Sequence, residues 1–436
     1  MTGSPAADQT LPPAVTESVT GTFDLASIED HVKVRRIADT LVSSGVGIDQ
    51  IKAMDSGDDA PLDLRLATKL ALSKHAIDNA GWTGRVGVVF AMWGEQRRLR
   101  PRSPDNPTGE DALRVKLDQL EWLFEGTNTD WRVYPVDDGD PDDSGTVAEE
   151  RASKHPEGTR VTVLRLGDVI PTSTGPLSDL DDVDDSRKGG AIVLGASVAM
   201  EDGCDVVVMT DADNSVNLGQ TGLLIAAHAE GANVVIGDRK HPEAVLVKAE
   251  ARWGPGIVVL RHMQRMVGRA LFSQGIRDTQ AAFKLYDRTS LDDILAAPST
   301  YGFAFDSDWL YGALSGGHSI DRVPFAFIDS FEESASLAQG PMTTWESLLR
   351  GLVDAARARG VDHNEEMAQV VDDHAHASEL DRVVEAVPPQ LDNVPDASLG
   401  DPSIMTPTEL RSWLEDLDSE QYRSDHGSDL GPEAWR

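Results

Sequence analysis

Two aspartates separated by one residue, Asp211 and Asp213, are the pair whose spacing points most directly to chemistry. They follow the apolar run Asp205–Thr210, which is typical of a buried strand. If the extended geometry continues, the two side chains point to the same side, where two carboxylates repel each other unless a cation lies between them. They could share one hard divalent ion and leave coordination positions open for a diphosphate. The alternative is a plain turn at a strand end, where Asp is common.

Carboxylates also follow two other apolar runs. Asp137 and Asp138 come directly after Trp131–Val136, and Glu95 comes shortly after Val86–Met92. In open α/β sheets, ligands bind beyond the carboxyl ends of the strands. These residues and the Asp211–Asp213 pair therefore form one candidate site.

The elements that must position these residues alternate along the centre of the chain. Short apolar runs predict further strands at Val161–Leu166 and Asn233–Gly237, and the stretches between them predict helices over Asp111–Phe124, Ala191–Glu201 and Thr221–Ala229. This alternation predicts an α/β fold with a mostly parallel sheet and helices on both faces.

The two ends of the chain differ from this centre. We expect a disordered segment over 1–20, a helical region over 21–83, the α/β domain over 84–335, and an acidic helical region with a polar tail over 336–436. Within the last region the spacing predicts helices at Trp345–Ala356, Glu365–Val383 and Pro407–Leu417. His363, His374 and His376 lie there and are either zinc ligands or solvent-facing helix residues.

Composition excludes several classes of protein. The 436 residues carry 74 acidic and 39 basic side chains, a formal charge of −35, which argues against nucleic acid as a partner. No apolar run approaches the roughly 20 residues of a transmembrane helix, no signal peptide is visible, and the one cysteine, Cys204, excludes an internal disulfide. We expect a cytoplasmic protein. The acidity itself is either a solubility shell or a bias of the genome.

Seven segments, in order, resemble motifs of the family 2 glycosyltransferases, which have a GT-A (Rossmann-like) fold. The resemblance is greatest to the dolichyl-phosphate glucosyltransferase and polyprenyl-phosphate mannosyltransferase group, and it covers Gly84 to about Ser336. The segments are Phe90–Gln96 for "IPAYNEE", Val136–Asp143 for "VDDGSTD", Arg187–Ala191 for "GKGGA", Thr210–Asp213 for the D-x-D motif, Val235–Arg239 for "IGSR", Ile276–Leu285 for "IRDTQCGFKLF" and Phe303–Leu310 for "WAFDVELL".

The resemblance implies a site for a nucleoside diphosphate sugar, with a UDP-sugar favoured, and for Mg²⁺ or Mn²⁺. The metal ligands would be Asp211 and Asp213. Glu95 and Asp138 would hold the nucleoside, and Arg239 would contact the diphosphate or an acceptor phosphate. The full implied donor site is Ala91, Trp93, Glu95, Asp137, Asp138, Lys188, Gly189, Asp211, Ala212 and Arg239.

The resemblance also places three carboxylates near the chemistry. Asp278 is the favoured catalytic residue, ahead of Asp306 and Asp308, for orienting or deprotonating the acceptor oxygen in an inverting transfer. If the acceptor is a phosphate, it is already ionised, so positioning matters more than proton removal.

Arginines are informative against so acidic a background. We assign acceptor or phosphate contacts to Arg261, Arg265, Arg277 and Gln280. Arg261, Arg265 and Arg269 would share one helical stripe, which is either an anion-binding surface or a solvated face paired with acidic residues. Arg97, Arg98, Arg100 and Arg102 follow the first strand, where a substrate role and a plain surface role are both open.

These expectations combine into a metal-dependent inverting glycosyltransferase, with glucose or a relative as the sugar. Gly94 and Ala281–Ala282 depart from the family pattern, which suggests a divergent sugar or acceptor. Because no membrane segment is visible, we expect a soluble small-molecule or phosphate-bearing acceptor, with a polyprenyl phosphate at the membrane surface as the alternative. A nucleotidyltransferase and a non-catalytic binding module are the rival classes, and a homo-oligomer is possible.

Overall fold

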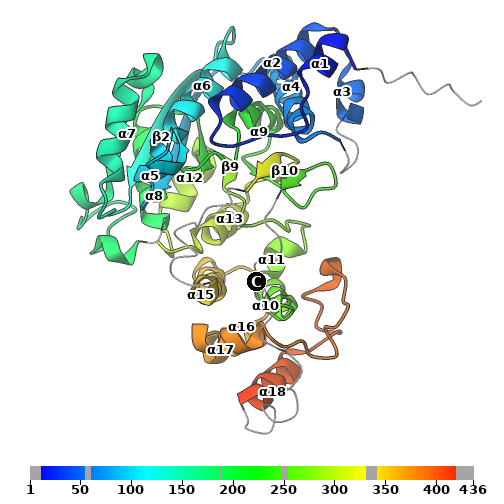
Figure 1. Cartoon of the computed structure of the whole chain (residues 1–436). Coiled ribbons are helices and arrows are strands. Elements are labelled where there is room, and N and C mark those ends of the chain that lie inside the picture. The colour runs from blue at the N-terminus through cyan, green and yellow to red at the C-terminus, as the bar shows by residue number, and fades with distance from the viewer. Residues whose placement is uncertain (1–10, 55–59, 187, 248–253, 330–340, 419–436) are drawn as a thin grey trace, which may run out of the picture. The chain divides into compact units, whose positions relative to one another are not determined.

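A computed structural model describes residues 11–54, 60–186, 188–247, 254–329 and 341–418 (Figure 1). The chain folds into two compact units. The first comprises Met1–Lys248, Arg277–Tyr301 and Gly312–Glu332, and the second comprises Ala249–Ile276, Gly302–Tyr311 and Glu333–Arg436. The second unit thus takes segments from within the predicted 84–335 domain.

A seven-stranded sheet in the order β10-β7-β9-β6-β1-β4-β5 forms the centre of the first unit. Neighbouring strands of this sheet pair in parallel, except that β9 is antiparallel to both β6 and β7. The strands are β1 (Arg85–Met92), β4 (Asp130–Asp137), β5 (Leu164–Arg165), β6 (Val206–Thr210), β7 (Val234–Gly237), β9 (Phe283–Asp287) and β10 (Ile320–Val323). The predicted α/β class is confirmed.

Helices cover both faces of this sheet because its strands are apolar on both faces. On one face, α8 (Gly189–Glu201) packs so closely that a Cβ on Gly195 would lie 2.4 Å from Val89. The opposite face, with Val88 and Phe90, belongs to one buried core with α4 (Leu62–Ala80), α6 (Ala112–Phe124) and α9 (Thr221–Ala229). Two small pairs complete the strands: β2 (Pro101–Ser103) with β3 (Asn106–Glu110), and β8 (Val245–Val247) with β11 (Ala326–Ile328).

The N-terminal helices belong to the first unit. They are α1 (Pro13–Ser18), α2 (Ile28–Ser43), α3 (Ile48–Met54) and α4, and Figure 1 shows α2 and α9 on either side of α4. The prediction of disorder over 1–20 is wrong for Pro13–Ser18, where Pro at the first helical position favours a helix start. Residues 1–10 lie outside the described residues.

The remaining elements of the first unit are short or connect strands. They are α5 (Gln96–Leu99), α7 (Ser144–Ser153), α12 (Arg288–Leu295) and the 3₁₀ turns Pro156–Arg160, Leu166–Asp168, Val183–Asp185 and Leu218–Gln220. The predicted strand Val161–Leu166 forms only the two-residue β5, because the chain enters a 3₁₀ turn at Leu166.

The second unit is helical. It contains α10 (Ile257–Val267), α11 (Arg269–Phe272), α15 (Pro341–Arg359), α16 (Glu365–His374), α17 (Ala377–Val383), α18 (Pro407–Asp418) and the 3₁₀ turn Asp396–Ser398, while α13 (Phe305–Ser315) begins in it. The predicted single helix Glu365–Val383 is two helices, since Ala375 leaves helical geometry and His376 starts the next helix. In the described residues, no helix is long and apolar enough to cross a membrane.

Candidate active site

The carboxyl ends of β1, β4 and β6 converge in the first unit, because these three strands are neighbours and parallel. The residues predicted from three separate sequence motifs therefore lie at one edge of the sheet. The site is built from the turns that follow these strands.

The turn after β1 presents Trp93 and Glu95. The Trp93 side chain is exposed, and the Glu95 carboxylate pairs with Arg98 at 3.0 Å. Ser144, at the start of α7, accepts a hydrogen bond from the Glu95 backbone N–H at 3.0 Å. Burial raises the pKa of Glu95, and Asp213 and Asp211 raise it further against the opposing charge of Arg98.

The two aspartates after β4 organise backbone. Asp137 accepts from the N–H groups of Asp140 and Gly145, at 2.8 and 2.9 Å, and so shapes its own loop. Asp138 accepts from the Ser186 hydroxyl at 2.5 Å and from the Lys188 N–H at 2.8 Å. Both aspartates are buried, and Asp138 ties the end of β4 to the start of α8.

Lys188 precedes α8 in a strained conformation, with φ at +76°. Its neighbour Gly189 has no room for a side chain, because a Cβ would lie 2.6 Å from the Tyr301 carbonyl. The bond from the Lys188 N–H to Asp138 and the crowding at Gly189 hold the backbone here, and the Lys188 ammonium donates to the Asp211 carboxylate. Arg187, in the predicted turn motif, lies outside the described residues.

The turn after β6 is held by residues far away in sequence. The Asp213 carbonyl accepts from the Lys116 ammonium at 2.5 Å, and the Asn214 N–H donates to the Glu110 carboxylate at 2.8 Å. Glu110 also lies 3.7 Å from the Arg98 guanidinium. The turn thus has a fixed backbone, while the Asp211 side chain remains 34% accessible.

Positive charge gathers around these aspartates. Burial acts to raise the pKa of Asp211, but the ammonium groups of Lys188 and Lys116 and the Arg239 guanidinium outweigh it and hold that pKa below its usual value. Asp211 is therefore ionised at neutral pH and compensated by protein cations. The ion pair with Lys188 means that a metal at Asp211 requires this lysine to move.

Sequence reasoning missed Lys116 and Glu110. Lys116 lies on α6 among buried apolar residues, on a stripe with Ala112, Gln119 and Leu123. A charged residue at a core position of an amphipathic helix is the signal that could have identified it.

Arg239 and Asp278, predicted separately, form one unit. The Arg239 guanidinium donates to both oxygens of Asp278, at 2.8 and 2.7 Å, and its backbone N–H adds a third bond at 2.9 Å. Asp278 is buried, which acts to raise its pKa, but these bonds and the charge of Arg239 hold the pKa low. A carboxylate so occupied is suited to orienting Arg239, which also stacks over the Phe327 ring at 5.0 Å.

The other predicted residues of the first unit differ in how far their side chains are exposed to solvent. Ala91 is half-buried in β1, and Ala212 is buried between the two aspartates. Arg277 is exposed, and its carbonyl accepts from Lys240 at 2.9 Å. Gln280 is half-buried beside Thr279.

Five residues singled out from the sequence belong to the second unit. Asp308 is fully buried and accepts two bonds from Arg359, at 2.8 and 3.0 Å, and Asp306 is also buried. Arg265 and Arg261 both pair with Asp396, at 2.5 and 3.5 Å. Arg269 pairs with Asp362 at 3.3 Å, so the arginine stripe is paired with acidic residues, as one of its two predicted readings states.

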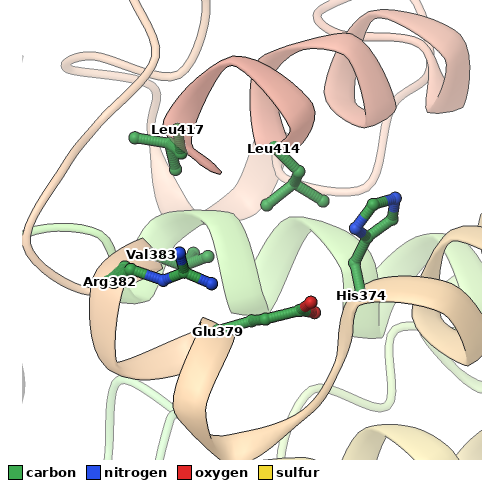
Figure 2. Close-up of a pocket in the computed structure, with 6 residues that line it drawn as sticks. All are labelled: His374, Glu379, Arg382, Val383, Leu414 and Leu417. Atoms are coloured by element: carbon green, nitrogen blue, oxygen red, sulfur yellow. The ribbon is translucent and has the colours of Figure 1, made fainter. Parts of the chain in front are cut away.

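A pocket in the second unit is lined by His374, Glu379, Arg382, Val383, Leu414 and Leu417 (Figure 2). It encloses about 210 Å³ including open solvent, below the roughly 300–1,000 Å³ of small-molecule sites. None of the residues predicted for the donor or acceptor lines it, although His374, one of the three histidines considered as zinc ligands, does. In the described parts of the chain, no group of three or more His, Cys, Asp or Glu side chains could hold a metal ion, which leaves no zinc site at His374.

The turn after β6 fits a metal shared with a substrate better than a metal held by protein alone. Asp213 uses one carboxylate oxygen to accept from the Ser215 N–H at 3.0 Å, and its other oxygen makes no hydrogen bond within the described residues. Mg²⁺ in nucleotide sites is bound by one or two carboxylates together with substrate phosphates. Asp213, with Asp211 once Lys188 has moved, matches that donor set.

Comparison with known proteins gives several relatives, although no family model matches the chain. A polyprenol monophosphomannose synthase from Mycolicibacterium smegmatis is 30% identical over 235 residues, which cover 52% of this chain and 80% of that protein. An undecaprenyl-phosphate mannosyltransferase from Micrococcus luteus is 28% identical over 198 residues, which cover 45% of this chain and 72% of that protein. Among solved structures, a mannosyl-3-phosphoglycerate synthase from Rubrobacter xylanophilus is 16% identical and covers 67% of this chain and 80% of its own, at a TM-score of 0.44.

Proposed function

The chain belongs to the family 2 glycosyltransferases, the family of the polyprenol monophosphomannose synthase to which it is 30% identical, and we propose that it transfers a hexosyl group from a nucleoside diphosphate sugar to a phosphate-bearing acceptor. The predicted family and enzyme class are confirmed by this relative and by the undecaprenyl-phosphate mannosyltransferase. Donor, metal, acceptor and stereochemistry belong to the proposal.

One observation carries the proposal: the ionised and partly accessible Asp211 carboxylate lies among protein cations at the carboxyl ends of parallel strands. Asp211 is partly exposed, and Lys188 compensates it from a side chain that is itself 26% accessible. Such a pair can open to admit a diphosphate and a divalent ion, because the ammonium can pass from a carboxylate to a phosphate oxygen. The Arg239 guanidinium, which also lowers the pKa of Asp211, is held in place by Asp278.

In the proposed mechanism, the turn Asp211–Asp213 and Lys188 hold the donor diphosphate. When bound at Asp213 and Asp211, Mg²⁺ or Mn²⁺ would neutralise the charge that develops on the leaving nucleoside diphosphate. An acceptor oxygen forms a bond to C1 of the sugar while the C1–oxygen bond to the diphosphate breaks, and that electron pair leaves with the nucleotide. In-line displacement of this kind inverts C1.

Asp278 does not act as the base in this scheme. The attacking oxygen of a phosphate is already ionised at neutral pH, so the transfer needs orientation rather than proton removal. Asp278 instead keeps Arg239 directed, and we assign Arg239 and the exposed Arg277 to the acceptor phosphate. Asp306 and Asp308, predicted behind Asp278, belong to the second unit, and both oxygens of Asp308 accept from Arg359.

The names of the two relatives favour mannose over the glucose expected from sequence, and a polyprenyl phosphate over a soluble phosphate ester. Both acceptor sources present the same phosphate oxygen. The assay must therefore contain both.

The test incubates the full chain with UDP-glucose, UDP-galactose or GDP-mannose, with Mn²⁺, Mg²⁺ or EDTA. Each mixture contains either a short-chain polyprenyl phosphate in detergent or a soluble hexose phosphate, and mass spectrometry identifies the product. We expect one donor and one acceptor class to give a product heavier by one hexose, with the metal required.

The matched variant for comparison with wild type is Asp213→Asn, which removes one charge at the same side-chain volume. Transfer should fall by about 100-fold or more in this variant, the scale seen when one electrostatic contact to the leaving charge is removed. Equal turnover by the two proteins, or no transfer with any combination, would contradict the proposal.

A further inference from the structure

Lys116 is a fully buried cation that the mechanism above does not use. It projects from α6, its side chain has no solvent exposure, and its ammonium lies 5.6 Å from the centroid of the Phe90 ring. Its one hydrogen bond within the described residues goes to the Asp213 carbonyl, at 2.5 Å. The contact therefore joins the core directly to the metal-binding turn.

Burial of this ammonium is costly by itself. Burial lowers the pKa of Lys116, and the carboxylates of Asp213, Glu110, Asp211 and Glu95 oppose that effect. An ammonium without a paired carboxylate at close range adds little to stability, because a well-packed apolar side chain of similar volume often serves as well or better. The reason for a cation at this position must then lie in the turn that it contacts.

Two cations flank the same turn and differ in mobility. Lys188 is partly accessible and contacts the Asp211 carboxylate itself, so an incoming ligand can displace it. Lys116 contacts a backbone carbonyl from inside the core, where no ligand can displace it. Its charge acts on anything that binds at Asp211 and Asp213.

We propose that Lys116 is a positioning residue that places a fixed positive charge beneath the Asp211–Asp213 turn, favouring the anionic donor and disfavouring a divalent ion that arrives alone. The inference rests on the proposed function. A fixed charge attracts the nucleoside diphosphate and repels the metal, so metal and donor bind well only together. The Asp213 carbonyl is held by the same group, which keeps the turn in place.

The test compares wild type with Lys116→Met and Lys116→Gln. Electron paramagnetic resonance measures the Mn²⁺ affinity of the donor-free protein, and calorimetry at saturating Mn²⁺ measures the affinities for UDP and GDP. Removing the charge should tighten Mn²⁺ binding about tenfold and weaken nucleoside diphosphate binding about tenfold, since each Coulomb contribution changes sign with the ligand. A purely structural role would weaken both.

Lys116→Gln keeps an N–H donor but removes the charge, and it provides a second variant if Lys116→Met does not fold. Lys154→Met, which removes an exposed pair with Glu150 in the same unit, is the control and should change neither affinity. Affinities that fall together, or Mn²⁺ binding that tightens in neither variant, would overturn the proposal. If wild type binds neither UDP nor GDP, the proposed function fails, while the Mn²⁺ measurement still decides the role of Lys116.

Discussion

The turn after β6 in the first unit and the Asp308–Arg359 pair in the second unit both place a carboxylate against a cation, with different consequences. Asp308 is fully buried, and both of its oxygens accept from one guanidinium. Asp211 is 34% accessible, and its partner Lys188 is 26% accessible. The Asp308–Arg359 pair leaves no carboxylate oxygen for a ligand. Asp211, in contrast, can exchange its Lys188 partner for a ligand.

This difference shows what a motif match leaves undecided. Both residues lie in segments that resemble family motifs, and from sequence both were candidates for the chemistry. Asp278 combines features of both. It is buried, as Asp308 is, but it orients Arg239 beside the site. The availability of the oxygens, rather than the residue type, separates the three.

The largest change in stability is expected at the buried Asp308–Arg359 pair. Arg359→Met leaves the Asp308 carboxylate buried without its partner, which should destabilise the second unit by about 3 kcal/mol or more. Urea unfolding followed by circular dichroism measures the change. An unchanged unfolding free energy would show that Asp308 is not held structurally and would restore it as a catalytic candidate.

A smaller effect is expected at Asp278. Asp278→Asn removes the charge that Arg239 binds, which should cost about 2 kcal/mol of stability and raise the acceptor KM more than it lowers kcat. The contribution of the Asp278 carboxylate to the free energy of unfolding also depends on pH. Because the folded pKa of Asp278 is depressed, its contribution is fully present above about pH 4 and is lost as the pH falls through that lower folded value.

The pH profile of transfer distinguishes positioning from base catalysis at this residue. If Asp278 positions Arg239, the fall of kcat toward acid pH that wild type shows should remain in Asp278→Asn. Loss of that limb, with kcat lowered at every pH, would make Asp278 the base and contradict the mechanism proposed above.

At the accessible pair, Lys188→Gly separates backbone strain from charge. Glycine suits the positive φ of this position, so the protein should fold at least as stably. The nucleoside diphosphate affinity should still fall about tenfold, equivalent to about 1.4 kcal/mol, because the ammonium is gone. Calorimetry with UDP and GDP measures this change, and unaltered binding would show that Lys188 does not reach the diphosphate.

The smallest effect is expected at the exposed pair of Arg269 and Asp362. Arg269→Met should cost less than about 1 kcal/mol, since both side chains are well exposed and solvent screens them. It is the matched control for Arg359→Met, with an arginine lost from the same unit. Equal costs for the two variants would mean that burial does not separate the pairs.

The sequence predicted the fold where short-range patterns dominate. The apolar runs at β1, β4, β6 and β7 and the helix Thr221–Ala229 are confirmed almost to the residue, because continuous apolar runs and helical spacing are local signals. The antiparallel strand β9 was not predicted, since Lys284 and Asp287 interrupt its apolar run and only tertiary pairing shows its direction.

The candidate site was predicted in part. Asp211, Asp138 and Lys188 do come together, as their positions after parallel strands and before a helix imply. The contacts of Lys116 and Glu110 with the same turn could not be predicted, because they join segments about 100 residues apart through buried polar groups. The pairing of Arg239 with Asp278 likewise follows from tertiary structure alone.

The proposed donor site is tested with crystals of the full chain containing Mn²⁺ and the donor identified by the transfer assay, with anomalous diffraction recorded at the manganese edge. We expect one manganese peak between the Asp213 carboxylate and the donor diphosphate, with the Lys188 ammonium on a phosphate oxygen. Lys188 still paired with Asp211, and manganese or nucleotide bound elsewhere, would contradict this expectation.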